Sequence, residues 1–309
     1  MNYVFFKGEF VPLEEAKIGI LTHSFHYGTA CFEGIRGHWN EEKGQLYLFR
    51  LREHYERLVE GCKLLKMELP YTIEDLCNIT VELIRESNIK EDLYVRPIAY
   101  KSSEALGVRL HDLECDIAIA VIPFAPYLDF EKGVRCCVSS WRRVSDDMIP
   151  PRGKITGIYI NSALAKTEAI ERGFDEAILL TEDGHVAEGS GENIFLVKDG
   201  KIITPPIYES ILVGVTRNTI MELSCEELGI EVVERRVDRY ELYIADECFF
   251  TGTAAYVTPI VEIDGRKIGD GKMGPVTRKL QEIYLDVVYG KVDKYMKWCL
   301  PVYPEEKRP

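Results

Sequence analysis

The chain has 309 residues, more than one compact hydrophobic core usually holds, so two domains are expected. Its 51 acidic residues against 38 basic ones give a net charge of -13, with the acids spread along the sequence. This pattern excludes the basic face that binding to nucleic acid or to an anionic membrane requires. Small-molecule partners are favoured.

The N-terminus lacks the basic-then-apolar layout of a signal peptide, and no later apolar run approaches the length of a membrane span. The nine cysteines, an odd number without a Cys-x-x-Cys pair, fit thiols in a reducing compartment better than a disulfide framework. We therefore expect a cytoplasmic protein without membrane contact.

The first half predicts a small α/β domain over residues 1–123. A helix is expected over 52–67, because apolar residues recur there at helical spacing, and Arg57 lies on the far side of that stripe. A second helix is expected to begin at Thr72, where Asp75 completes a capping box. Strands are predicted at 3–11 as a pair turning at 7–8, and at 32–37, 46–50, 93–100 and 117–122.

Two histidines, His23 and His26, are three residues apart and invite comparison with metal ligands. No third ligand stands at a recognisable spacing. Hydrogen-bonded structural histidines are therefore the favoured interpretation, and no metal is predicted.

An interdomain linker is expected over 124–133, followed by a large C-terminal domain over 134–309. The fold class is α+β, with mixed sheets and flanking helices. Helices are predicted at 159–174, 215–228 and 274–289, and strands at 134–139, 176–180, 193–204 as a hairpin around Asp199-Gly200, 230–237 and 247–251, with a further hairpin at Asp264-Gly265. The tail from Val302 to Pro309 is expected to be frayed.

The stretch from Met148 to Val197 organises the chain. It contains Lys154 among small residues and, about 35 residues later, Glu188 at the start of a glycine-rich turn, an arrangement that suggests a cofactor cradle. Spacing alone does not identify the cofactor.

Three further segments offer groups for an anion. Gly214-Val215-Thr216-Arg217 opens a helix whose unpaired N–H groups attract a phosphate, although such a start is also a common cap. Thr251-Gly252-Thr253-Ala254-Ala255 is a small-residue turn, either a ligand-binding turn or a plain tight turn. Tyr94 and Arg96 share one face of a strand, and a surface arginine is the alternative there.

The ordered set of motifs resembles the branched-chain amino-acid aminotransferases, class IV enzymes of pyridoxal-phosphate (PLP) fold type IV. The resemblance runs from about Phe5 to Tyr289 and rests on the order of many short motifs rather than on any single one. These are His26-Tyr27-Gly28-Thr29, Phe32-Glu33-Gly34-Ile35-Arg36, Tyr94-Val95-Arg96-Pro97, Lys154, Glu188-Gly189-Ser190-Gly191-Glu192-Asn193, Pro205-Pro206, Gly214-Val215-Thr216-Arg217 and Thr251-Gly252-Thr253-Ala254-Ala255.

The resemblance implies PLP as the cofactor. Lys154 would be its covalent attachment point and a proton carrier, and Glu188 would face its pyridine nitrogen. Tyr159 would hydrogen-bond its phenolic oxygen, where a core tyrosine at a helix start is the alternative. Its phosphate would be held by Arg57, Val215, Thr216 and Thr253. Without that role Arg57 is expected on a solvated helix face.

The resemblance also implies a substrate pocket that accepts both apolar and dicarboxylic side chains. Arg96 would pair with the distal carboxylate of glutamate or 2-oxoglutarate, and the N–H groups of Thr253 and Ala254 would receive the α-carboxylate. The walls would be Phe32, Tyr94 and Tyr127, together with Tyr27 and Val108 of the neighbouring subunit. A pocket shared in this way implies an obligate homodimer, with a homohexamer as a larger assembly.

The expected reaction is reversible amino transfer from L-leucine, L-isoleucine or L-valine to 2-oxoglutarate by a ping-pong route. Arg109-Leu110-His111 departs from the Asn and Pro of many bacterial members, which leaves tolerance of aromatic amino acids or (R)-amines open. The alternatives are a D-amino-acid or (R)-amine aminotransferase, an aminodeoxychorismate lyase, and a phosphometabolite-binding protein that performs no covalent chemistry.

Overall fold

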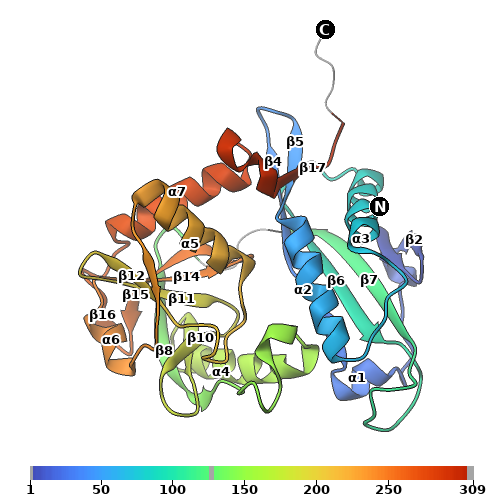
Figure 1. Cartoon of the computed structure of the whole chain (residues 1–309), viewed down its shortest axis with the longest axis horizontal. Helices are drawn as coiled ribbons and strands as arrows, with labels where there is room; N and C mark the ends of the chain where they lie inside the picture. Colours follow the sequence, from blue (N-terminus) through green and yellow to red (C-terminus); the bar gives the residue numbers. More distant parts are fainter. Residues whose placement is uncertain (1–2, 125–128, 305–309) are drawn as a thin grey trace. The chain divides into compact units, whose positions relative to one another are not determined.

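The structure, a computed structural model, describes residues 3–124 and 129–304 (Figure 1). It divides into two compact units. Unit 1 comprises Met1–Ala125, Gly153–Gly157 and Asp286–Pro309, and unit 2 comprises Pro126–Arg152 and Ile158–Leu285. The two units are defined by contacts between residues and not by continuous stretches of chain. The predicted domain limits of 1–123 and 134–309 therefore stay a prediction. Lys154 belongs to unit 1.

Unit 1 is built on an eight-stranded sheet in the order β17-β5-β4-β6-β7-β1-β2, with β3 also paired to β6. Every ladder in it is antiparallel. The strands are β1 (Tyr3–Phe6), β2 (Glu9–Pro12), β3 (Ala30–Phe32), β4 (Ile35–Asn40), β5 (Gln45–Phe49), β6 (Leu93–Lys101), β7 (Cys115–Pro123) and β17 (Cys299–Pro301).

The single strand predicted at 32–37 is wrong, because the chain leaves the ladder at Glu33-Gly34, between β3 and β4. A Cβ atom on Gly34 would lie 1.9 Å from the Tyr94 hydroxyl oxygen, so only glycine allows this close passage beside β6. The break also turns the Glu33 side chain into the interior, where it is 0% exposed.

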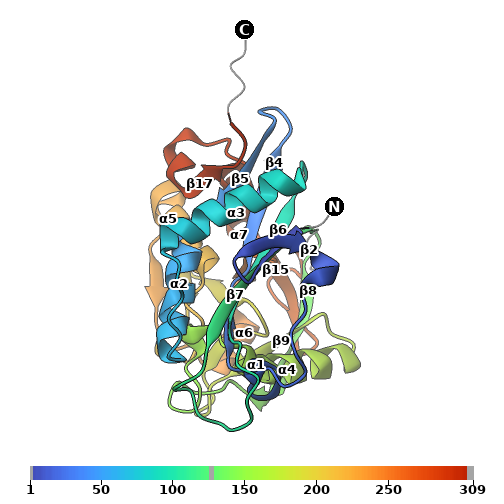
Figure 2. The same ribbon diagram turned by 90° about the vertical axis from the view of Figure 1, so that its right-hand side faces the viewer.

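Two long helices cover this sheet. α2 (Leu51–Leu64) buries Tyr55, Leu58 and Cys62 in the core, as its apolar stripe predicted. α3 (Ile73–Ser87) lies across β1 and β7, as Figure 2 shows, and begins at the predicted capping box of Thr72 and Asp75. The remaining helical segments are η1 (Leu13–Glu15), α1 (His23–Tyr27) and η4 (Asp293–Trp298).

Unit 2 contains a nine-stranded mixed sheet in the order β10-β9-β8-β15-β14-β11-β12-β13, with β16 paired to β15. β8 is parallel to both β9 and β15, and β12 is parallel to β13. The strands are β8 (Val134–Arg142), β9 (Glu176–Leu180), β10 (Val186–Gly189), β11 (Asn193–Lys198), β12 (Lys201–Thr204), β13 (Val232–Glu234), β14 (Glu247–Gly252), β15 (Tyr256–Ile263) and β16 (Arg266–Lys267).

Helices pack on this sheet through small and apolar residues. α4 (Tyr159–Glu171) places Ala165 and Ala169 against β8 and β9, and α5 (Val215–Leu228) packs on β14 (Figure 1). The other helices are α6 (Arg239–Ile244) and α7 (Pro275–Val288), and two 3₁₀ turns, η2 (Pro151–Gly153) and η3 (Thr156–Ile158), flank Lys154. No helix among the described residues is long and apolar enough to cross a bilayer.

Two predictions of secondary structure are corrected. The strand predicted at 230–237 shrinks to Val232–Glu234, because its pairing with β12 extends over these three residues alone. The expected frayed tail is ordered at its start, since Val302 is fully buried and its N–H donates to the Leu46 carbonyl at 2.9 Å. Residues 305–309 lie outside the described part.

Candidate active site

Lys154 has a left-handed backbone, with φ of 45°, which is unfavourable for a residue that carries a Cβ atom. The surrounding chain in unit 1 holds it there. Its carbonyl accepts from the Phe32 N–H at 3.3 Å, and the Thr156 hydroxyl donates to the Gly28 carbonyl at 2.9 Å. Ile155 forms a β-bridge with Cys31. The backbone is thus fixed on both sides of Lys154, and this fixes the direction in which its side chain leaves the chain.

The Phe32 ring lies beside the Lys154 side chain in unit 1. The Nζ atom of Lys154 lies 5.0 Å from the centre of the Phe32 ring, and Cζ of Arg96 lies 4.6 Å from the same centre. Arg96 also donates from Nη2 to the Tyr94 hydroxyl at 3.0 Å. Of the residues predicted for the substrate pocket, Phe32 therefore lies beside Lys154, and Arg96 lies beside Phe32 and Tyr94.

Arg57, on α2, does not lie on a solvated helix face, so that interpretation is wrong. Its side chain is 12% exposed and is paired with the Glu33 carboxylate. Nε donates to Oε1 at 2.6 Å and Nη2 to Oε2 at 2.8 Å. The guanidinium is thereby held in a fixed plane and is largely shielded from solvent.

The loop that follows β6 is anchored to α1. The Tyr27 hydroxyl accepts from the Gly107 N–H at 3.0 Å, and the buried His23 donates from Nε2 to the Gly107 carbonyl at 2.8 Å. His26 donates to the Ile20 carbonyl, so both histidines have the structural hydrogen bonds that were predicted. The anchoring leaves Val108 83% exposed. Tyr127, also predicted for the pocket, lies outside the described residues.

In unit 2 Glu188 is a buried carboxylate with donors on both oxygens; the residue is 5% exposed. Arg143 donates from Nε to Oε1 at 2.9 Å. Oε2 accepts from Asn193 Nδ2 at 3.1 Å and from the Leu212 N–H at 3.0 Å. These three donors fix the plane of the carboxylate. The sequence pointed to Glu188 but not to Arg143, because an arginine after a strand has no distinguishing local pattern.

Asn193 joins the three glycine-rich segments of unit 2. Its Nδ2 atom donates to the Leu212 carbonyl at 2.8 Å as well as to Glu188. It is paired with Thr251 across the β11–β14 ladder. A Cβ atom on Gly214 would lie 2.2 Å from its Oδ1. The turn after Glu188, the start of α5 and the turn after β14 therefore meet at one asparagine.

Predicted cofactor residues gather around that meeting point. Val215 and the buried Thr216 occupy the first turn of α5, which contains no acidic residue, and Thr253 and Ala254 follow β14. A cavity of about 20 Å³ separates Tyr159 from Glu188, with Arg143, Ser190, Asn193 and Leu212 among its other lining residues. The buried atoms of this unit that have no hydrogen-bond partner among the described residues include Arg143 Nη1 and Thr251 Oγ1.

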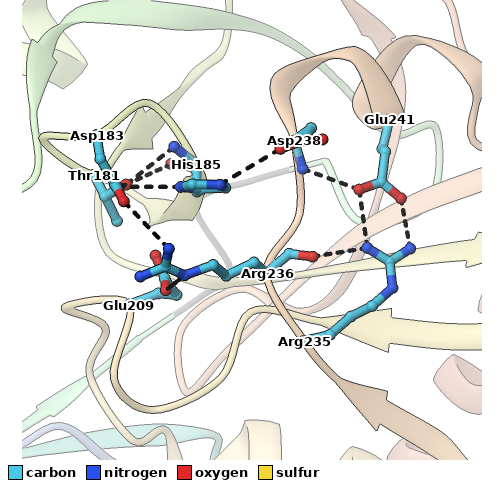
Figure 3. A network of polar contacts seen from close by, with 8 residues as sticks. All are labelled: Thr181, Asp183, His185, Glu209, Arg235, Arg236, Asp238 and Glu241. Atoms are coloured by element: carbon cyan, nitrogen blue, oxygen red, sulfur yellow. Dashed lines mark hydrogen bonds and ion pairs between the residues drawn. The ribbon is translucent and has the colours of Figure 1, made fainter.

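One cluster in unit 2 has the spacing of metal ligands. Asp183, His185 and Glu209 place one ligand atom each within 4.8 Å of the others. Figure 3 shows that Arg236 already supplies the positive charge there, since its Nε donates to Glu209 at 2.7 Å and its Nη1 lies 3.5 Å from Asp183. The cluster is an ion-pair network, and it carries no metal proposal.

Comparison with known proteins identifies the family of the chain. A family model described as amino-transferase class IV matches residues 30–263. The chain is 57% identical over 303 residues to the probable branched-chain-amino-acid aminotransferase of Aquifex aeolicus (strain VF5), covering 98% of this chain and 97% of the relative. It is 44% identical over 298 residues to the branched-chain-amino-acid aminotransferase of Pseudomonas aeruginosa, covering 96% and 95%.

Solved structures give the same result. The branched-chain aminotransferase of Thermoproteus uzoniensis with norvaline has a TM-score of 0.94 at 48% identity, covering 98% of this chain and 100% of that one. The enzyme of Thermobaculum terrenum in its PLP form has a TM-score of 0.94 at 39% identity, covering 98% of each chain. The protein belongs to the class IV aminotransferase family. The resemblance drawn from the motifs and the predicted α+β fold type IV are both confirmed.

Proposed function

We propose that this protein is a PLP-dependent branched-chain aminotransferase that moves the amino group of L-leucine, L-isoleucine or L-valine to 2-oxoglutarate. The names of its relatives support the substrate class. Two similar structures, one in PLP form and one complexed with N-(5'-phosphopyridoxyl)-L-glutamate, support the cofactor. The observation that carries the proposal is the buried Glu188 carboxylate held by Arg143, Asn193 and the Leu212 N–H.

The residues present fit PLP. Bound PLP supplies an electron sink for the α-carbon of the substrate. The Glu188 carboxylate would face the ring nitrogen, and Tyr159, which lines the same cavity, offers a hydroxyl for the phenolic oxygen. We assign Lys154 as the attachment point and as the base that moves a proton on the substrate, because its backbone is fixed on both sides while its side chain extends past Phe32.

The phosphate is assigned to four residues. The N–H groups of Val215 and Thr216 open α5, where the helix dipole attracts an anion. Thr253 adds donors from the turn after β14, and Arg57 adds a guanidinium that is already oriented by its ion pair with Glu33. The buried hydroxyl of Thr251, beside the same turn, has no hydrogen-bond partner among the described residues, which supports a ligand at this place.

The substrate is assigned to groups of two kinds. Arg96 binds the distal carboxylate of glutamate or 2-oxoglutarate, while Phe32 and Tyr94 beside it contact an apolar side chain. The backbone N–H groups of Thr253 and Ala254 bind the α-carboxylate. Tyr127 is retained as a pocket residue from the sequence.

We further propose a homodimer at least, with a hexamer as a larger assembly, in which Tyr27 and Val108 serve the pocket of the neighbouring subunit. Large apolar side chains are exposed around α1 and the anchored loop: Ile20 at 73%, Phe25 at 63%, Leu106 at 69% and Val108 at 83%. Apolar groups gathered in this way favour a protein partner. The nine free cysteines suit the cytoplasm, which we propose as the location.

The test is a visible absorption spectrum of the purified protein, titrated with L-leucine and then with 2-oxoglutarate. We expect a yellow band that leucine removes and 2-oxoglutarate restores, as each half-reaction proceeds. A band that responds to D-amino acids or (R)-amines but not to L-leucine would favour one of the alternative aminotransferases, and a band indifferent to every amino donor would favour the lyase. A protein that stays colourless with added PLP would reject the whole proposal.

A further inference from the structure

Glu33 is a buried carboxylate that has no role in the proposed reaction. It stands at the break between β3 and β4, is 0% exposed, and accepts four hydrogen bonds. Two come from Arg57, one from His54 Nδ1 at 2.8 Å and one from the Gly34 N–H at 3.3 Å. Buried ion pairs contribute little net stability compared with apolar side chains, so stability alone does not explain a buried, ionised carboxylate at this position.

The geometry of the pair with Arg57 is a two-bond fork. Nε and Nη2 face the two carboxylate oxygens at 2.6 and 2.8 Å, which uses two of the five N–H groups of the guanidinium. Such a fork fixes the plane of the group as well as its position. Nη1 thereby lies on the side of the guanidinium away from Glu33.

His54 completes the arrangement from the same face of α2, three residues before Arg57. Burial lowers the pKa of His54, so its imidazole is neutral at physiological pH. An ionised carboxylate can only accept hydrogen bonds, so the Nδ1 atom of His54 carries the hydrogen and donates a hydrogen bond to Glu33. The neutral histidine therefore orients the carboxylate through a hydrogen bond, while Arg57 supplies the positive charge that pairs with it.

The location of Glu33 links it to the site. It directly follows Phe32, whose N–H donates to the Lys154 carbonyl and whose ring lies 5.0 Å from Lys154 Nζ. Glu33 therefore connects the strand that holds the lysine backbone with the helix that carries Arg57.

We propose that Glu33 is a positioning residue, which fixes the guanidinium plane of Arg57 so that its outward N–H edge receives the phosphate of the cofactor. This inference rests on the proposed function, because it assumes that Arg57 binds that phosphate. Glu33 acts through Arg57 and touches neither cofactor nor substrate.

The test compares the Kd for PLP with the Kd for pyridoxal, which lacks the phosphate, in full-length protein freed of cofactor. The variants are Glu33→Gln, Glu33→Asp, Arg57→Gln and the double variant Glu33→Gln/Arg57→Gln. The matched control is Glu176→Gln, which also removes a fully buried carboxylate from an ion pair, with Lys166 Nζ at 2.6 Å.

We expect Glu33→Gln to raise the Kd for PLP about tenfold or more and to change the Kd for pyridoxal by less than about twofold. In the Arg57→Gln background, Glu33→Gln should add less than about twofold, because the two residues act as one unit. Glu33→Asp keeps the charge but shortens the side chain, so it should also raise the Kd for PLP. If Glu33→Gln fails to fold, Glu33→Asp alone tests the inference.

Three outcomes would overturn the inference while leaving the proposed function intact. These are unchanged PLP affinity in both Glu33 variants, tighter PLP binding in Glu33→Gln, and an equal loss for PLP and pyridoxal that Glu176→Gln also shows. If the wild-type protein binds no PLP, the proposed function fails and the inference fails with it.

Discussion

Arg143 donates from Nε to Oε1 of Glu188 at 2.9 Å, and both side chains are 6% exposed. A second nitrogen of the same guanidinium, Nη1, is buried without a partner among the described residues. The pair thus joins a buried carboxylate to a buried guanidinium, and its two members can be separated by substitution.

Arg143→Met should lower the free energy of unfolding by about 3–5 kcal/mol, because it leaves Glu188 as a buried, uncompensated charge. Urea denaturation measures this. The neighbouring Arg142 is exposed, and Arg142→Met should change the free energy of unfolding by less than about 0.5 kcal/mol. Equal losses in the two variants would show that the ion pair with Glu188 is unimportant.

Lys154→Ala and Lys154→Gly should both abolish transamination, because both remove the amine on which the proposed chemistry depends. The two should differ in stability. With φ of 45° the backbone suits glycine, so Lys154→Gly should be more stable than Lys154→Ala by roughly 1 kcal/mol. Activity with leucine and thermal unfolding of both proteins check this. Wild-type turnover in either variant would refute the assigned role of the lysine.

Gly61→Ala should destabilise the protein, although alanine is the better helix former by about 1 kcal/mol. Gly61 lies within α2, and a Cβ atom there would approach the Gly153 carbonyl oxygen to 2.5 Å, a backbone atom beside Lys154. Overpacking of this kind costs about 1–3 kcal/mol. Chemical denaturation is the measurement, with the exposed Glu60→Ala as control. A stability gain for Gly61→Ala would mean that α2 moves away at no cost.

The stability of the wild-type protein should fall below about pH 4.5 partly through Glu33. Burial alone raises the pKa of Glu33, but the Arg57 charge and the His54 hydrogen bond outweigh it and hold the pKa below its usual value of 4.5. A carboxylate with a lowered folded-state pKa contributes stability that is present above the unfolded pKa and is lost as the pH falls towards the folded one.

Glu33→Gln removes this titration. Its free energy of unfolding, measured by denaturant titration between about pH 7 and pH 3, should therefore fall less steeply below pH 4.5 than that of the wild type. Glu74→Gln, which neutralises an exposed carboxylate paired with Arg52, should follow the wild-type slope. Parallel curves for Glu33→Gln and the wild type would contradict the lowered pKa.

Arg96→Ala should impair the half-reaction with 2-oxoglutarate more than that with leucine, because only the former substrate has a distal carboxylate. Losing a charge-assisted pair costs about 1.5–3 kcal/mol, or roughly 10- to 100-fold in kcat/KM for 2-oxoglutarate. Single-turnover kinetics of each half-reaction separate the two. Equal losses for both substrates would reject the carboxylate role of Arg96.

Features that depend on neighbours in the sequence were predicted well. The capping box of Thr72 and Asp75 starts α3, Gly214 and Gly229 bound α5, and Asp199-Gly200 turns the hairpin of β11 and β12 with φ angles of 49° and 73°. The short α1 and α6 were missed, because a helix of about one or two turns has too few residues to show a period.

The order of the motifs along the chain, by itself, determined the family, the fold class and the identity of Lys154 and Glu188 as candidates, because a series of short motifs in one order is specific even where each one is weak. Only the tertiary structure decided which groups surround them. It placed Phe32 at Lys154, Arg96 at Phe32, Arg143 at Glu188, and Glu33 at Arg57. Each of these contacts joins segments that are far apart in sequence, and a buried charge leaves no periodic pattern along the chain, so its partner is fixed only when the packed core brings the two together.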